Sequence, residues 1–334
     1  MPELLNLHNP LSPGDVAVMT AAIKALHKTY PGRFVTDYSG NSPELLLHNP
    51  YITPMESGRI RNIDMGYPVI NQSNQKSFHF VEGYTEFLSA ELGLEIERPD
   101  IKPDIYISDE ERRSEGQVQR MVGERVPYWI LVAGGKYDYT AKWWDQHRFQ
   151  EVVRDFAGKI CFVQVGDHDH FHPNIEGVLD LRGKTDMREL VNLVYNAQGV
   201  LCPVTLLMHL AAGVPCPDHF PPSRACVVVA GGREPPHWEA YPTHQFIHTV
   251  GALECCSLGG CWKSRAFPLK DGDIKDLPSH LCSNPIKRSK QLTLPKCLDM
   301  IKPEEVIRRI LLYFEDGREY LTSKQYEKIK PLLT

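Results

Sequence analysis

Continuous apolar runs alternate with amphipathic segments along the second half of this chain. The clearest unit begins at Tyr128, where YWILVAGG is typical of a buried parallel strand. After a polar turn, Phe149, Val152, Val153 and Phe156 share one helix face, and Asp145 suits its N-cap. Further strands are expected at 160–165, 178–181, 199–202, 225–230 and 246–250, and helices at 186–197, 205–212 and 302–316. This order predicts an α/β protein with a doubly wound parallel sheet, which binds ligands at the carboxyl ends of its strands.

The first half shows a similar but less regular pattern. Short strands are expected at 4–7, 34–37 and 66–70, and helices at 14–27 and 80–92. Residues 95–127 carry prolines and the charged run DEERRSE, which is typical of a linker. We therefore expect two domains, residues 1–125 and residues 126–334, which suits a chain of 334 residues.

The polar turn that follows the strand at Tyr128 is a candidate anion site. It contains two glycines, a hydroxyl and two ammonium groups: Gly134, Gly135, Lys136, Thr140 and Lys142. Such groups between a strand end and a helix N-terminus favour a phosphate. An ordinary connecting loop with solvated lysines explains the same composition equally well.

Composition and charge narrow the class of protein. Apolar residues make up 42% and charged residues 24%, as in globular proteins, and the net charge of −5 argues against a nucleic-acid-binding protein. No run of about 18 apolar residues occurs, so no membrane span is expected. The N-terminal residues lack the features of a signal peptide, so we expect a cytoplasmic protein whose cysteines are thiols or metal ligands.

Five of the nine cysteines gather between residues 255 and 297. They are Cys255, Cys256, Cys261, Cys282 and Cys297. Four thiolates suit tetrahedral Zn²⁺ or Fe, and only one of the adjacent pair would be needed. The spacing is irregular, so a set of buried apolar thiols is the alternative. Clustering in a strand-poor region favours a structural metal site.

Three stretches carry a resemblance to a known family. They are PGDVAVMTAAIKAL from Pro13, TAKWW from Thr140 and VTLLMHLAAGVP from Val204. With their order and spacing, the chain resembles the heptosyltransferases, which take a heptose from ADP-heptose. The resemblance implies the GT-B architecture of two facing Rossmann-like domains, here with a cysteine-rich metal-binding insertion. A subset of that family carries a comparable cysteine-held iron.

The resemblance also implies roles for individual residues. Asp15 matches the proposed catalytic base, Lys142 the lysine at the donor phosphates, and Thr205 and His209 the motif beside the diphosphate. From the residues alone, Asp15 also suits the first turn of a helix, and His209 would more often be a core histidine. The family aspartate and glycine fall on Val204 and Leu206, which puts the donor sugar, and even activity, in doubt.

Several other residues are considered for the cleft. Gly231, Arg233 and Glu234 occupy the place of a family turn, and no role is carried over to them. Asp167 and Asp169 are the one D-x-D match, interpreted as loop residues rather than metal ligands. Trp143 and Trp144 are expected to pack under their loop rather than stack on adenine. His79 is a weak candidate for facing the acceptor.

The implied reaction is inverting transfer of heptose to an acceptor hydroxyl, with Asp15 as base and no catalytic metal. The acceptor, whether a glycan, a protein or a small molecule, is not indicated. A nucleotide-sugar-binding protein without catalysis, or a transferase with another nucleotide-sugar donor, is the alternative. A third hypothesis makes the cysteine region an interaction module that drives homo-oligomerisation.

Overall fold

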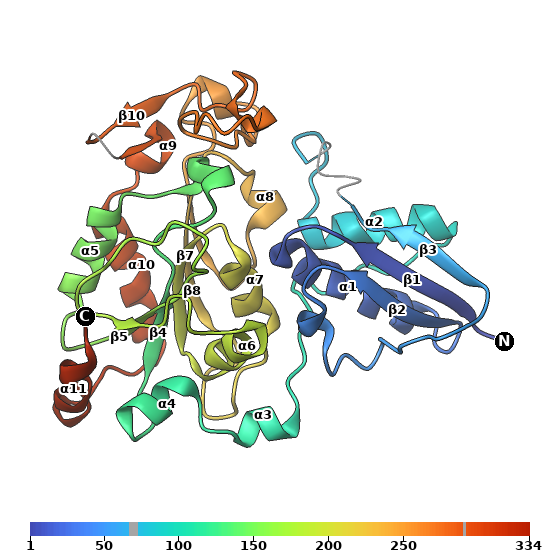
Figure 1. Cartoon of the computed structure of the whole chain (residues 1–334), viewed down its shortest axis with the longest axis horizontal. Coiled ribbons are helices and arrows are strands. Elements are labelled where there is room, and N and C mark those ends of the chain that lie inside the picture. Colours follow the sequence, from blue (N-terminus) through green and yellow to red (C-terminus); the bar gives the residue numbers. More distant parts are fainter. Residues whose placement is uncertain (67–72, 290–291) are drawn as a thin grey trace.

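A computed structural model describes residues 1–66, 73–289 and 292–334, and the chain forms two parallel sheets (Figure 1). The smaller sheet has the strand order β2-β1-β3. Its strands and helices are β1 (Glu3–Asn9), α1 (Pro13–Thr29), β2 (Phe34–Gly40), β3 (Ile60–Asp64) and α2 (Phe80–Leu92). Strand β1 lies in the middle of this sheet, with β2 on one side and β3 on the other. The first turn of α1 begins beside the carboxyl end of β1.

The larger sheet has the order β6-β5-β4-β7-β8-β9, and all of its strand pairs are parallel. Its elements are β4 (Tyr128–Leu131), α5 (Gln146–Asp155), β5 (Cys161–Gln164), β6 (Leu179–Asp180), α6 (Met187–Asn196), β7 (Gly199–Pro203), α7 (Leu206–Gly213), β8 (Ala225–Gly231), α8 (Pro236–Glu239) and β9 (Gln245–His248). This is the doubly wound order: successive strands are added on one side of β4 up to β6 and then on its other side, beginning with β7. Ligands of such sheets bind outside the carboxyl ends of the two strands where this change of side occurs, here β4 and β7.

The remaining elements connect the sheets or close the chain. They are α3 (Asp109–Arg113), α4 (Gln117–Val122), β10 (Pro285–Lys287), β11 (Thr293–Pro295), α9 (Lys296–Asp299), α10 (Pro303–Glu315) and α11 (Ser323–Ile329). Short 3₁₀ helices lie at Pro43–Leu46, Tyr137–Lys142, Glu254–Cys256, Ile274–Asp276 and Lys330–Leu332. The segment with α3 and α4 carries the chain from the smaller sheet to the larger one (Figure 1). The boundary proposed at residue 125 falls there, between α4 and β4.

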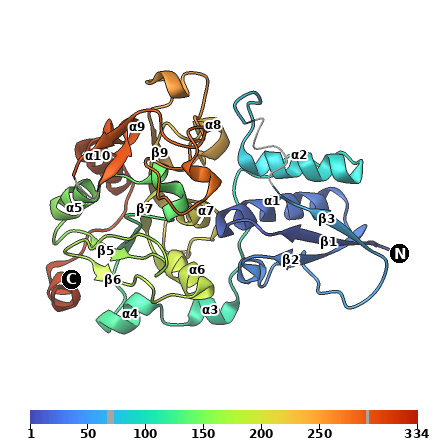
Figure 2. The ribbon, with the colours of Figure 1, turned by 45° about the horizontal axis from the view of Figure 1, so that its top comes forward.

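Two apolar cores hold these layers together. One contains Phe149 of α5 and Ile310 of α10 and covers one face of the larger sheet. The other covers the opposite face and continues without a break into the smaller sheet, from Met208 of α7 to Val16 of α1. Helices α1 and α7 pack against each other, side by side in both views (Figure 2). The two halves therefore share a core at this contact.

Most of the expected elements are confirmed, and the differences have local causes. Helix α2 has the expected bounds, and Gly93 ends it with a φ of 66°. Strand β3 was not predicted, and the strand expected at 66–70 lies, apart from Gly66, outside the described residues. Gly213 is the last residue of α7 rather than its cap. A Cβ there would lie 2.7 Å from the side chain of Pro103, so close packing explains this glycine.

Among the described residues, no helix is both long enough and apolar enough to cross a bilayer.

Candidate functional site

The first turn of α1 meets α7 at the boundary between the two sheets. A Cβ at Gly14 would lie 3.1 Å from the His209 ring, so any other residue here would push the imidazole away by a few tenths of an ångström. Asp15 follows directly and is 7% exposed. The structure thus brings Asp15 and His209, from opposite halves of the chain, to one place.

The imidazole of His209 is buried in a polar cluster. Its Nδ1 lies 2.7 Å from the hydroxyl of Tyr241, a partner that sequence reasoning missed. Burial, then electrostatic interactions with His79 and Lys142, hold the pKa of His209 well below its ordinary value. The ring is therefore neutral at physiological pH and can act only as a hydrogen-bonding group.

Lys142 reaches the carboxyl end of β7 from the loop after β4, where the doubly wound order places ligands. Its Nζ lies 2.7 Å from Oε1 of Glu234 and 3.4 Å from the carbonyl oxygen of Val204. Glu234 also pairs with the neighbouring guanidinium of Arg233. Burial alone would raise the pKa of Glu234, but the two cations more than offset it and hold the pKa below its ordinary value. The carboxylate is therefore charged and shared.

A second buried carboxyl group, Glu239 on α8, was not identified from the sequence. Burial and the nearby charge of Glu234 raise its pKa to about 8, and Asp15 adds to the effect. Its Oε2 has no hydrogen-bond partner in the structure. Glu239 is thus a neutral carboxylic acid at pH 7. In the sequence, Glu239 is marked only by its position, eight residues after β8 ends at Gly231.

Two further predicted residues lie at helix starts around the same place. Lys136 donates from Nζ to the hydroxyl of Ser12 at 3.0 Å, and Ser12 is the N-cap residue of α1. This bond bridges the two halves. Thr205 is the N-cap of α7, and its hydroxyl accepts from the Leu207 amide at 3.3 Å. Both residues sit near the place where α1 packs against α7.

The glycines and the threonine of the anion turn serve the packing of the loop. Gly135 donates its N–H to the Phe171 carbonyl at 2.9 Å, so that amide is already paired. A Cβ at Gly134 would collide with the same carbonyl oxygen, at 2.0 Å. Thr140 is fully buried, and its hydroxyl accepts from the Ala266 amide at 2.8 Å. The expectation that the Gly135 amide and the Thr140 hydroxyl face a phosphate is therefore not met in this structure.

The aromatic residues of the loop pack as expected. Trp143 stacks on Phe171 with ring centroids 4.4 Å apart, and Trp144 donates to the Ile301 carbonyl at 3.2 Å. His79 caps α2 by accepting from the Val81 amide at 3.1 Å. Burial lowers its pKa to about 4. His79 is thus neutral and part of the cluster around Tyr241.

All five clustered cysteines line one small cavity of about 10 Å³, together with Arg233 and Asn284. Burial raises the pKa of the Cys297 thiol to about 12, although backbone hydrogen bonding at Gly232 opposes the shift. Burial also raises the pKa of the Cys261 and Cys282 thiols, and backbone groups at Lys263 and Asn284 oppose the shift. Such N–H···S contacts stabilise thiolates, and thiolates are the form that binds Zn²⁺ or Fe.

The adjacent pair in this cavity differs in its contacts. Cys256 donates from Sγ to the Leu253 carbonyl at 3.4 Å, whereas the sulfur of Cys255 accepts from the Asn284 amide at 3.5 Å. Cys255 is therefore the better ligand candidate of the two. No three cysteine sulfurs of the described residues lie within 4.8 Å of one another, so metal binding would draw the thiols together.

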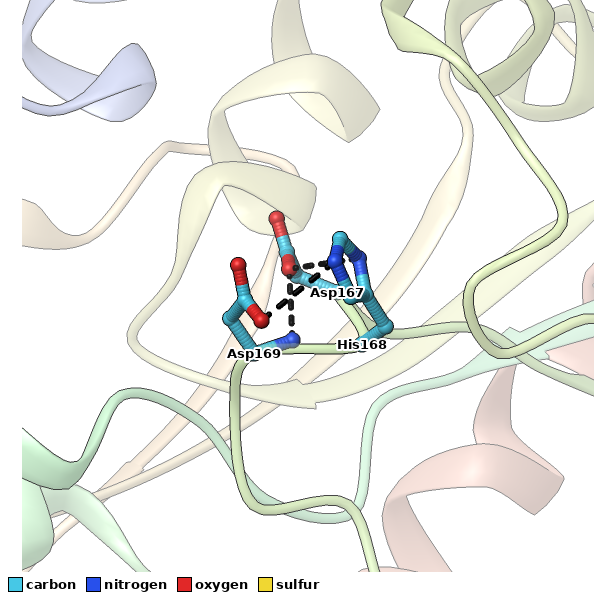
Figure 3. A group of neighbouring side chains, drawn as sticks. All are labelled: Asp167, His168 and Asp169. Atoms are coloured by element: carbon cyan, nitrogen blue, oxygen red, sulfur yellow. Dashed lines mark hydrogen bonds and ion pairs between the residues drawn. The ribbon is translucent and has the colours of Figure 1, made fainter.

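Asp167, His168 and Asp169 form a separate group at the surface (Figure 3). The imidazole lies between the carboxylates, with Nδ1 3.4 Å from Asp167 and Nε2 3.3 Å from Asp169. Asp167 also accepts from the Asp169 amide at 2.9 Å. All three side chains are exposed, as the interpretation of Asp167 and Asp169 as loop residues requires.

Comparison with known protein families finds a match for part of the chain. The sequence model of glycosyltransferase family 9 (heptosyltransferase) matches residues 64–218. No curated protein sequence matches the chain.

Similar solved structures cover 94% of this chain. A family 9 glycosyltransferase from Veillonella parvula has 15% identity, 98% of its own length covered and a TM-score of 0.61. ADP-heptose LPS heptosyltransferase II of E. coli has 14% identity, 100% coverage and a TM-score of 0.59. The iron-containing dodecameric glycosyltransferase TibC of enterotoxigenic E. coli has 18% identity, 77% coverage and a TM-score of 0.58.

At these identities the structures establish a shared fold, the GT-B arrangement expected from the sequence. The family match covers the linker and the first half of the larger sheet, with Lys142 and His209 inside it. Residues 64–218 thus match the family 9 glycosyltransferase model, and the chain as a whole shares the fold of these solved structures.

Proposed function

We propose that this protein transfers a heptose from ADP-heptose to an acceptor hydroxyl with inversion at the anomeric carbon. The observation that carries the proposal is the meeting of Asp15 with His209, and of Lys142 with the start of α7, at the switch point of the larger sheet. A candidate base and a cation for the leaving group thus lie near the same buried cluster, since Asp15 and Lys142 both act on the pKa of Glu239.

In the proposed reaction, the acceptor oxygen attacks the anomeric carbon as the bond to the diphosphate breaks. Asp15 takes the proton of the acceptor hydroxyl, and ADP leaves with the bonding electrons. Lys142 and the amino end of α7, capped by Thr205, stabilise the charge that develops on the diphosphate. Neutral His209 and Tyr241 donate or accept hydrogen bonds there without adding charge. The protein's own cations stabilise the leaving group in this scheme.

We further propose that Cys255, Cys261, Cys282 and Cys297 hold one structural Fe or Zn ion. The donor set, the shared cavity and the backbone groups directed at the sulfurs support this assignment. TibC, with the same fold, is an iron-containing enzyme. The ion would hold together a segment of short 3₁₀ helices and loops.

A second candidate function is nucleotide-sugar binding without transfer. Val204 and Leu206 contribute no polar side chain at the start of α7, and Glu234 already neutralises part of the charge of Lys142. Both features lower the expected affinity for a diphosphate.

Release of ADP from ADP-heptose separates the two functions. The protein would be incubated with ADP-heptose and, in turn, lipopolysaccharide core, protein and small-molecule acceptors. Acceptor-dependent ADP release, with an inverted anomeric signal by NMR, is expected. Calorimetric binding of ADP-heptose without release by any acceptor would favour the non-catalytic function. No binding and no release would contradict both.

A further inference from the structure

The ammonium group of Lys142 is held in a fixed position by other parts of the protein. It contacts Oε1 of Glu234 at 2.7 Å and the Val204 carbonyl at 3.4 Å, and it lies 5.6 Å from the ring centre of Tyr139. An ammonium carries three N–H donors. Two of them face these acceptors, and the side chain keeps 24% of its surface exposed. One donor is thus left for a further acceptor.

The partner of this contact, Glu234, is itself fixed by Arg233. The guanidinium pairs with the same oxygen of Glu234, and its Nε donates to the Lys263 carbonyl at 2.6 Å. Its carbon lies 5.2 Å and 5.4 Å from the ring centres of Tyr139 and Trp262. Both charged side chains are almost completely buried, so neither can swing out to meet a ligand. Arg233 therefore acts on the carboxylate and not on the solvent.

We propose that Glu234 is a positioning residue that aims Lys142 at the donor diphosphate, and that Arg233 cancels the charge that would otherwise repel the same diphosphate. The inference rests on the proposed function, because it assumes an ADP-sugar as the donor. The Arg233–Glu234 pair has no net charge. The three side chains of Arg233, Glu234 and Lys142 together therefore carry the single positive charge of Lys142. An orienting carboxylate beside an anion-binding lysine is tolerable only with such a counter-ion.

A purely structural ion pair predicts a different pattern of variants. If Arg233 and Glu234 only stabilise the fold, losing both is at least as harmful as losing either one. If Arg233 shields the diphosphate from Glu234, removal of Arg233 alone is the worst case. Removing the carboxylate as well should then restore part of the affinity, because the repulsion disappears.

Calorimetric titration with ADP and with adenosine, on wild type, Glu234→Gln, Arg233→Gln and the double variant, tests the proposal. We expect Glu234→Gln to weaken ADP binding roughly tenfold and Arg233→Gln roughly a hundredfold. The double variant should return to the level of Glu234→Gln. Adenosine affinity should stay the same throughout, since adenosine has no phosphate. A double variant no better than Arg233→Gln would overturn the proposal.

Controls separate the failure of this inference from that of the proposed function. Glu305→Gln removes a carboxylate that is likewise paired with two arginines, on α10 away from the cleft, and should leave ADP affinity unchanged. Wild type that binds ADP no better than adenosine would contradict the ADP-sugar donor itself. If Arg233→Gln unfolds in a thermal scan, Glu234→Gln still decides, because unchanged ADP affinity in that folded variant would overturn the positioning role.

Discussion

At the scale of single residues, the buried cluster around Lys142 contains two carboxyl groups whose pKa values are shifted in opposite directions. Glu234 stays ionised between two cations, whereas Glu239 keeps its proton up to about pH 8. Two like charges in one buried cluster cannot both be stable, so one of them is neutral. Asp15 adds to the negative potential that raises the pKa of Glu239.

Replacing Asp15 with asparagine removes the proposed base but keeps the shape of the side chain. We expect turnover of ADP-heptose to fall about 10²–10⁴-fold, because general base catalysis contributes that much. ADP affinity should change little, since Asp15 contacts the acceptor in the proposed reaction. Steady-state kinetics and calorimetry measure the two quantities separately. Wild-type turnover by Asp15→Asn would exclude this residue as the base.

The proton on Glu239 makes the stability of the protein depend on pH. Its pKa rises from an ordinary 4.5 to about 8 on folding, so the folded protein holds a proton that the unfolded chain releases. This stabilisation is complete below pH 4.5 and is lost as the pH rises through 8. The free energy of unfolding should fall by up to about 1.4 kcal/mol per pH unit within that window from this group.

Glu239→Gln mimics the protonated acid and should remove this component of the pH dependence. Urea unfolding of both proteins at pH 6, 7 and 8 gives the comparison. The variant should gain on the wild type steadily as the pH rises. Parallel curves for the two proteins would mean that Glu239 titrates alike in the folded and unfolded chain.

At the scale of elements, the helices and strands that could be predicted are those marked by residues close together in the sequence. Helix α6 begins where Asp186 and Glu189 form a capping box, and α5 begins after its N-cap Asp145, because capping depends on neighbours in the sequence. Strand β3, with mostly exposed residues, carries no apolar run and was missed. The partners of Lys142 and His209 were also missed, since Glu234 and Tyr241 meet them only through the packing of distant loops.

The cysteine-rich segment makes its own prediction at this scale. Serine at Cys255, Cys261, Cys282 or Cys297 should release the metal and disorder the segment, because metal binding at such sites is largely folding free energy. Cys256→Ser is the matched control, since a hydroxyl can keep the bond to the Leu253 carbonyl. Limited proteolysis and metal content report the outcome. Equal behaviour of Cys255→Ser and Cys256→Ser would contradict the assignment of ligands.

At the scale of the whole molecule, the two sheets are joined by one continuous core and by polar contacts at separate places around it. Helices α1 and α7 form the middle of this junction. On one side of this junction, Arg188 of α6 pairs with Glu111 of α3 at 2.7 Å. Side chains of the smaller half thus reach the larger half at several separate places.

The purified protein should contain about one Fe or Zn ion per chain, measured by mass spectrometry of the elements. Removal of the ion by a chelator should expose residues 250–300 to proteases while the circular dichroism of the sheets persists. The sheets have their own apolar cores, so they do not need the ion. A preparation that is free of metal, well folded and fully active would contradict the metal proposal.

The two halves are also joined through Asn74, which precedes α2. Its side chain donates to the Gly260 carbonyl at 2.9 Å and accepts from the Gly260 amide at 3.1 Å and from Trp262 at 3.3 Å. Next to it, His237 of α8 contacts the Ser73 carbonyl at 2.7 Å. Separating the two halves at this end means breaking all four bonds. The cysteine-rich segment, far along the chain from Asp15, is therefore one of the places that hold the two halves together.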